Sequence, residues 1–315
     1  MSTRKWIRWG TTIAALTTVG YLLSRHLKQV TGRAQEIPPA RSKRLLERAA
    51  PLIRLPSCPD EMPQVLPDGS GLRCRATGLI YPFEHGILDL LEPRVAKTFN
   101  QRVLDTALTS WGYDSLRSWL TYALNTLSFA EEVAYIQQRL QVRGGDTVLD
   151  LACGHGNFTV EWAQWAGSQG LVIGLDLSRI MLTRAAYHCE SWGLENVLLI
   201  RGDAQRLPFA AASFHKVNCS GGFHQIPDLS QALQEISRVS ADGAVLTAST
   251  FAEAPNDPFS LTKKWVYRWS ALHFVSLSWL GEQLSALGYS DYGWKLTGGR
   301  FAYLSARKRR SADAV

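Results

Sequence analysis

A glycine-containing run near the middle of the chain combines residue types that hold a ligand closely. Residues 148–159 read Val-Leu-Asp-Leu-Ala-Cys-Gly-His-Gly-Asn-Phe-Thr, so that Asp150 ends an apolar stretch and two glycines follow it. Gly154 and Gly156 let the backbone pass close to a ligand and turn sharply into a helix. The run therefore predicts a small-molecule binding loop between a strand and a helix.

Two further carboxylates follow later apolar stretches. Asp176 lies 26 residues after Asp150, and Asp203 follows a third stretch. A carboxylate at the end of a second strand can accept hydrogen bonds from both ribose hydroxyls. Dinucleotide enzymes use a similar loop, but Thr159 stands where the third fingerprint glycine would fall, so the helix need not hold a pyrophosphate. Each acid alone is also typical of a turn; three in this order predict one composite site.

These motifs resemble those of class I S-adenosylmethionine-dependent methyltransferases, whose first motif reads Asp-x-Gly/Ala-x-Gly-x-Gly. The resemblance covers residues 139–308, about half the chain, and is nearest to the ubiquinone/menaquinone-biosynthesis-like small-molecule enzymes. It implies S-adenosylmethionine as cofactor. Asp150 would then meet the methionine end, Asp176 the ribose and Asp203 the adenine amino group. The other implied cofactor-binding residues are Ala152, Gly154, Gly156, Leu177, Met181 and Ala204.

Some positions depart from the family pattern. Residues 235–239 fit its Glu-x-x-Arg-Val motif, but residues 240–243 keep one glycine of the usual ending. His215 stands where an acid usually follows the aromatic residue. Neither departure lies in the cofactor loop.

The acceptor side is carried by residues 218–228, Asn-Cys-Ser-Gly-Gly-Phe-His-Gln-Ile-Pro-Asp. His224 occupies the place where small-molecule relatives carry a histidine, so it is the candidate catalytic residue, with a structural hydrogen bond as the alternative. No proline precedes Cys219, which favours a packing role for that thiol. The implied reaction is a direct methyl displacement, in which a general base is needed only if the acceptor starts protonated.

Strand and helix signals alternate from residue 145 onward. The predicted strands are 146–151, 171–176, 197–201, 213–218, 244–249, 292–296 and 301–306, and the predicted helices are 158–165, 179–192, 229–239 and 277–287. This alternation predicts an α/β fold with a Rossmann-like, doubly wound and mostly parallel seven-stranded sheet, closed by an antiparallel edge pair.

Positive charge is concentrated at the start of the chain. Residues 1–50 hold ten Lys/Arg and two acids, although the whole chain carries a net charge of only +7. Residues 9–24 contain no charge and are flanked by basic residues. We therefore assign residues 1–29 to a hydrophobic membrane anchor, with a targeting peptide or an amphipathic helix as alternatives, and residues 30–56 to a basic linker.

A small β-rich module is predicted at residues 57–95, followed by a helical cap at 96–140 and the catalytic domain at 141–315. The module resembles the zinc ribbon that precedes some methyltransferase domains, but Glu61 and Thr77 replace the second cysteine of each knuckle. This donor set predicts a metal-free relic. Five scattered cysteines argue against a disulfide framework and favour a reducing, cytoplasm-like compartment.

Together these features predict a membrane-tethered methyltransferase for a hydrophobic small molecule or lipid. The connection at residues 263–274 is rich in tryptophan, as expected of an interfacial helix, though core packing explains it equally. An RNA methyltransferase is the first alternative, weakened by the missing cysteines and the near-neutral catalytic body. A non-catalytic cofactor-binding protein is the second. The sequence gives no indication of oligomeric state.

Overall fold

The computed structural model describes residues 37–92, 127–253, 274–298 and 301–310. The predicted anchor at 1–29, most of the predicted cap and the tryptophan-rich connection lie outside these residues. Within the described ranges, the helices are too short or too polar to cross a bilayer.

The catalytic region contains all seven predicted strands. They are β5 (Thr147–Leu151), β6 (Leu171–Asp176), β7 (Val197–Arg201), β8 (Phe214–Ser220), β9 (Ser240–Phe251), β10 (Tyr289–Thr297) and β11 (Phe301–Lys308). Strands β5 to β9 pair in parallel, whereas β11 pairs antiparallel with both β9 and β10. The predicted Rossmann-like α/β fold and its antiparallel edge pair are confirmed.

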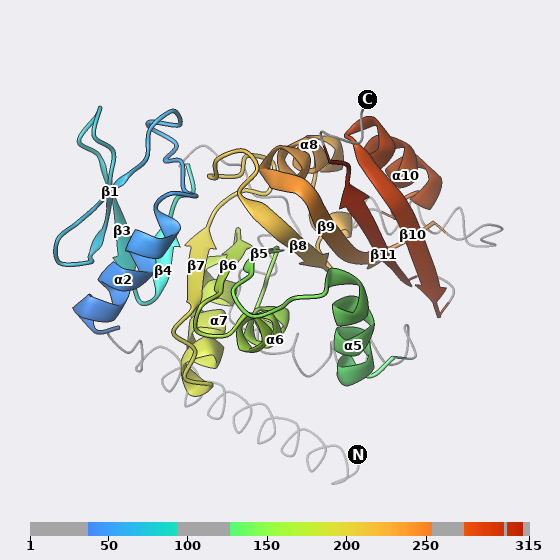
Figure 1. The fold of residues 1–315 in the computed structure, drawn as a ribbon, viewed down its shortest axis with the longest axis horizontal. Coiled ribbons are helices and arrows are strands. Elements are labelled where there is room, and N and C mark those ends of the chain that lie inside the picture. Colours follow the sequence, from blue (N-terminus) through green and yellow to red (C-terminus); the bar gives the residue numbers. More distant parts are fainter. Residues whose placement is uncertain (1–36, 93–126, 254–273, 299–300, 311–315) are drawn as a thin grey trace, which may run out of the picture. The chain divides into compact units, whose positions relative to one another are not determined.

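Among the described residues, the sheet has eleven strands where the sequence predicted seven. Its order is β1-β2-β3-β4-β7-β6-β5-β8-β9-β11-β10 (Figure 1). The extra strands β1 (Gln64–Val65), β2 (Gly71–Arg73), β3 (Ile80–Glu84) and β4 (Ile87–Asp89) belong to the small module. Because β4 pairs in parallel with β7, the module continues the catalytic sheet and covers a strand that would otherwise be an open edge.

Helices cover both faces of the sheet. Strand residues alternate between two apolar clusters, so that Val148 and Val172 belong to one and Leu149 and Ile173 to the other. The first cluster includes residues of α5 (Phe129–Leu140), α6 (Asn157–Ala166) and α7 (Arg179–Ser191). The second includes residues of α2 (Pro39–Ala49), α8 (Leu229–Val239) and α10 (Leu277–Ala286). Polar side chains at Ser128, Ser178, Asp228 and Ser276 cap four of these helices.

Cys58 and Cys74 of the module form a disulfide, with their Cα atoms 6.1 Å apart. The sequence argued against such bridges, and this pair corrects that expectation. The two cysteines are 16 residues apart, and the β1–β2 hairpin between them brings their turns together. Cys153, Cys189 and Cys219 are free thiols.

Candidate active site

The glycine loop leaves β5 and enters α6 through left-handed backbone conformations. Ala152, Gly154 and Gly156 have φ angles of +54°, +55° and +77°. A Cβ atom placed at Gly154 would meet nothing within 4 Å, whereas one at Gly156 would lie 2.9 Å from the Cβ of Ala185. Gly154 therefore faces open space beside the loop, and Gly156 allows α6 to pack closely against α7.

Asp176 ends β6 and holds the glycine loop. Its Oδ2 accepts a hydrogen bond from the Gly154 amide at 2.9 Å, and its Oδ1 accepts one from the Ser178 amide at 2.8 Å. The side chain is partly exposed. The glycine loop and Asp176, the second of the predicted carboxylates, are thus in direct contact, as a shared ligand site requires.

Asp203 follows β7, the strand next to β6. Its Oδ1 accepts a hydrogen bond from the Gln205 amide at 2.9 Å, and the residue is partly exposed. Leu177 is also partly exposed, and Met181 is buried beneath it on α7. Strands β7, β6 and β5 are neighbours and run in parallel, so the residues after them meet at one edge of the sheet. This edge is suited to an adenosine group. The two accessible carboxylates can accept hydrogen bonds from it, the apolar residues can lie against its flat ring, and Gly154 leaves space for it.

Asp150 lies beneath the loop and is only 1% exposed. Its carboxylate accepts hydrogen bonds from Thr159 Oγ1 at 2.5 Å and Asn218 Nδ2 at 2.8 Å. Burial raises the pKa of Asp150 to about 6, against the opposing effect of these two donors. Through these two hydrogen bonds, Asp150 links its own strand, β5, to α6 and β8. Its contact with the methionine end of the cofactor stays a prediction.

This raised pKa predicts a pH-dependent stability. The pKa of Asp150 in the folded protein, about 6, lies above its ordinary value of 3.8, so the neutral acid is favoured by folding. Its contribution to the free energy of unfolding should fall as pH rises from about 4 to about 6 and stay constant above, with a slope below about 1.4 kcal/mol per pH unit. Urea unfolding of the wild type and Asp150→Asn across this range should give curves that diverge, and parallel curves would contradict the assignment.

The acceptor side begins at the end of β8. His224 lies in a short 3-10 helix, Phe223–Gln225, and is 5% exposed. Its Nδ1 is 3.5 Å from Thr250 Oγ1, and its ring meets that of Phe251 edge-to-face at 4.7 Å. A Cβ placed at Gly222 would lie 2.8 Å from the Cβ of Ala152, so this turn packs directly on the cofactor loop.

Aromatic side chains extend from His224 along the ends of β9 and β11. Phe251 lies 6.1 Å from Phe274 and 5.3 Å from Phe301, measured between ring centroids. We call His224, Phe251, Phe274 and Phe301 the aromatic wall. The three phenylalanines were not predicted, because they come from distant parts of the sequence. Cys219 is fully buried, and burial raises the pKa of its thiol well above the ordinary value, in accord with a packing role.

Comparison with known proteins agrees with this geometry. A family described as a methyltransferase domain matches residues 143–282. The demethylmenaquinone methyltransferase of Geobacillus stearothermophilus is 30% identical over 182 residues, which cover 58% of this chain and 73% of the relative. This chain belongs to the class I S-adenosylmethionine-dependent methyltransferases. The enzyme of the same name from Listeria monocytogenes is 30% identical to this methyltransferase over 203 residues, 64% of this chain and 78% of the relative.

A solved structure shows the same fold. Phosphoethanolamine N-methyltransferase 2 of Haemonchus contortus, in complex with S-adenosyl-L-methionine, matches the methyltransferase with a TM-score of 0.58 and 15% identity. The match covers 70% of this chain and 62% of the other. As in the family to which this chain belongs, S-adenosylmethionine is the cofactor of this methyltransferase, and it supplies the electrophilic methyl group that is transferred to the acceptor.

Proposed function

We propose that this methyltransferase acts on a hydrophobic small molecule that carries a hydroquinone (the reduced form of a quinone) or another aromatic ring. The observation that supports this most directly is the aromatic wall, which lies at the ends of β8, β9 and β11 and adjoins the cofactor loop through Gly222 and Ala152. Edge-to-face and offset contacts with such a wall favour a flat ring over a charged or flexible acceptor. The relatives named demethylmenaquinone methyltransferase support the same class of acceptor.

His224 is the proposed catalytic residue. Its burial beside Phe251 removes it from bulk water, and the Thr250 hydroxyl restricts the orientation of its ring. An imidazole in this place would take the proton that a phenol-type acceptor releases, or hold that acceptor in line with the methyl group. In the proposed cofactor site, Asp176 and Asp203 bind the ribose and the adenine, Leu177 and Met181 flank the ring, and Ala152, Gly154, Gly156 and Ala204 form the backbone cradle above Asp150.

A quinone with an isoprenoid tail partitions into lipid, and the apolar segment at residues 9–24 is suited to keep the enzyme beside it. We therefore propose that residues 1–29 attach the chain to a membrane.

Methyl transfer from labelled S-adenosylmethionine tests this function. Vesicles containing a demethylated quinone lipid in its reduced, hydroquinone form should be labelled by the wild type, and His224→Ala should lower the turnover number by roughly 10² to 10⁴, the usual contribution of general acid–base catalysis. Binding of S-adenosylhomocysteine should be unchanged. His215→Ala, at an exposed histidine, is the matched control and should keep full turnover.

The same assay tests the membrane attachment and the alternatives. A chain without residues 1–29 should methylate a water-soluble, short-tailed hydroquinone normally but lose most activity on vesicles. Labelling of RNA in place of the quinone would support an RNA methyltransferase instead. Cofactor binding without transfer to any extract would support a non-catalytic protein.

A further inference from the structure

The last strand of the small module ends beside the proposed cofactor site. Strands β4, β7 and β6 run in parallel, and their register places Asp89 opposite Arg201 and Arg201 opposite Asp176. The three charged residues thus form a row across the ends of three neighbouring strands. Asp176 is the proposed ribose ligand, so the module reaches the edge of the adenosine site through one intervening side chain.

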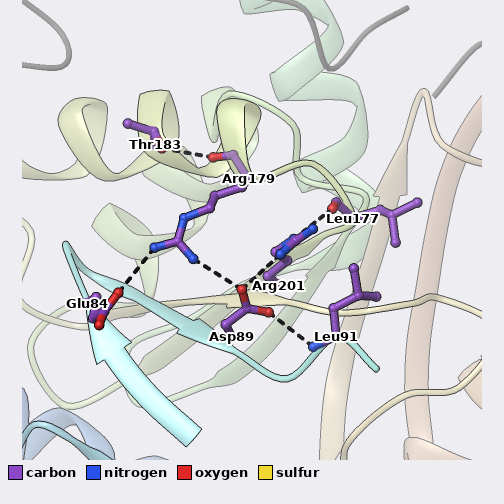
Figure 2. A network of polar contacts seen from close by, with 7 residues as sticks. All are labelled: Glu84, Asp89, Leu91, Leu177, Arg179, Thr183 and Arg201. Atoms are coloured by element: carbon purple, nitrogen blue, oxygen red, sulfur yellow. Dashed lines mark hydrogen bonds and ion pairs between the residues drawn. The ribbon is translucent and has the colours of Figure 1, made fainter. Parts of the chain in front are cut away.

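Asp89 binds two arginines of the catalytic domain. Its Oδ2 accepts hydrogen bonds from Arg201 Nη1 at 2.9 Å and from Arg179 Nη1 at 3.1 Å. Figure 2 shows both guanidinium groups converging on this carboxylate from β7 and from the start of α7. Asp89 Oδ1 also accepts a hydrogen bond from the Leu91 amide at 3.3 Å, which fixes the carboxylate itself.

Arg201 links Asp89 to the backbone of the proposed cofactor loop. Its Nε donates a hydrogen bond to the carbonyl oxygen of Leu177 at 3.3 Å, and Leu177 directly follows Asp176. The guanidinium therefore bridges the module carboxylate and the backbone of the loop that we assign to the adenine. Figure 2 shows Arg201 between Asp89 and Leu177.

The pair of Asp89 and Arg201 is sheltered enough for its charges to matter. The Asp89 and Arg201 side chains are 21% and 22% exposed. Solvent screens such a pair less than a surface pair. Without the carboxylate, Arg201 would lose its ion pair and would face Arg179, whose remaining partner is the exposed Glu84, and the repulsion between the two guanidinium groups would displace Arg201 from the Leu177 carbonyl.

A second contact ties the same segment to the loop of Asp203. The Leu90 amide donates to the Arg201 carbonyl at 2.9 Å, and Glu92 pairs with Arg206 at 2.9 Å. Arg206 lies three residues after Asp203. The end of the module thus contacts the loop of Asp203 directly, through Arg206, and the loop of Leu177 through Arg201.

We propose that Asp89 is a positioning residue for S-adenosylmethionine, acting through Arg201 on the Leu177 loop. This inference rests on the proposed adenosine site at Asp176 and Leu177. It gives the small module a role in cofactor affinity. Because Asp89 would act on the adenosine end of the cofactor, its loss should weaken the binding of adenosine and of S-adenosylhomocysteine by the same factor.

Calorimetry with these two ligands tests the proposal without an acceptor. Asp89→Asn keeps the shape of the side chain and removes its charge, and it should weaken both ligands about tenfold. Glu84→Gln is the matched control. Glu84 is a carboxylate of the same module that binds the same Arg179, but its side chain is 58% exposed and its contact is longer, 3.5 Å. This variant should bind both ligands as the wild type does.

Arg201→Lys serves as a second variant in case thermal unfolding shows that Asp89→Asn is poorly folded. Lysine keeps the charge opposite Asp89 but lacks the planar fork whose Nε and Nη1 atoms reach Leu177 and Asp89 separately, so it should also weaken both ligands about tenfold. Unchanged affinity in both variants, or equal losses in the Glu84→Gln control, would overturn the proposal while the wild type still bound the ligands. A folded wild type that bound neither ligand would overturn the proposed cofactor site itself.

Discussion

Replacing Asp176 with alanine should weaken S-adenosylmethionine binding roughly a hundredfold or more. Hydrogen bonds to a charged acceptor contribute about 1.5–3 kcal/mol each, and a ribose offers two. The same carboxylate holds the Gly154 and Ser178 amides, so its loss also releases the loop that must be in place before the cofactor arrives. The expected loss therefore combines missing contacts with a less ordered site. Calorimetry with S-adenosylmethionine measures it directly.

Asp68→Ala is the matched control for this experiment. Asp68 also accepts a hydrogen bond from a backbone amide two residues later, that of Ser70 at 3.0 Å, but it is an exposed turn residue of the small module. The Asp68→Ala variant should bind S-adenosylmethionine with the same dissociation constant as the wild type. If Asp176→Ala bound the cofactor as tightly as this control, the ribose assignment would have to be abandoned.

Gly156→Ala should destabilise the fold by about 2–5 kcal/mol. A left-handed backbone costs an L residue about 1–2 kcal/mol, and overpacking adds about 1–3 kcal/mol. Both apply at Gly156, because its φ is +77° and a new Cβ would lie 2.9 Å from the Ala185 Cβ and 3.2 Å from its Cα. Helices α6 and α7 would have to separate. Urea unfolding gives the change in the free energy of unfolding.

Gly154→Ala separates this packing effect from ligand binding. Gly154 has a φ of +55°, but a Cβ there meets nothing within 4 Å, so only the backbone cost of about 1–2 kcal/mol applies. The added methyl group would project into the space assigned to the cofactor and should weaken S-adenosylhomocysteine more than tenfold. A larger loss of stability at Gly154 than at Gly156 would show that the two glycines have been given the wrong roles.

The elements that the sequence predicted well are those with local signals. Strand β5, the glycine loop and α6 are contiguous, and the acids at Asp176 and Asp203 each end their own apolar run, so their placement follows from the parallel sheet alone. Strand β4 is three residues long, too short for a period-2 pattern to be recognised, and it pairs with a strand more than a hundred residues later.

The parts that could not be predicted depend on distant residues meeting. Asp89 and Arg201, like Phe251 and Phe301 in the aromatic wall, become neighbours only once the sheet order is known. Asp150 shows a different limit. Its position at the end of β5 was predicted, but its direction was not, because the alternation of faces along β5 and the donors Thr159 and Asn218 decide where the carboxylate points.

The pairing of β4 with β7 also sets an order of events during synthesis. The module leaves the ribosome before the first strand of the catalytic sheet, and its last strand, β4, can pair with β3 at once but lacks its second partner until β7 has followed. Closing a loop of that length is slow compared with forming the β3–β4 hairpin, which needs only neighbouring residues. The module should therefore gather around its own disulfide and hairpins first and dock last. Until β7 is available, the exposed edge of β4 is only three residues long, which limits the length over which another nascent chain could pair with it.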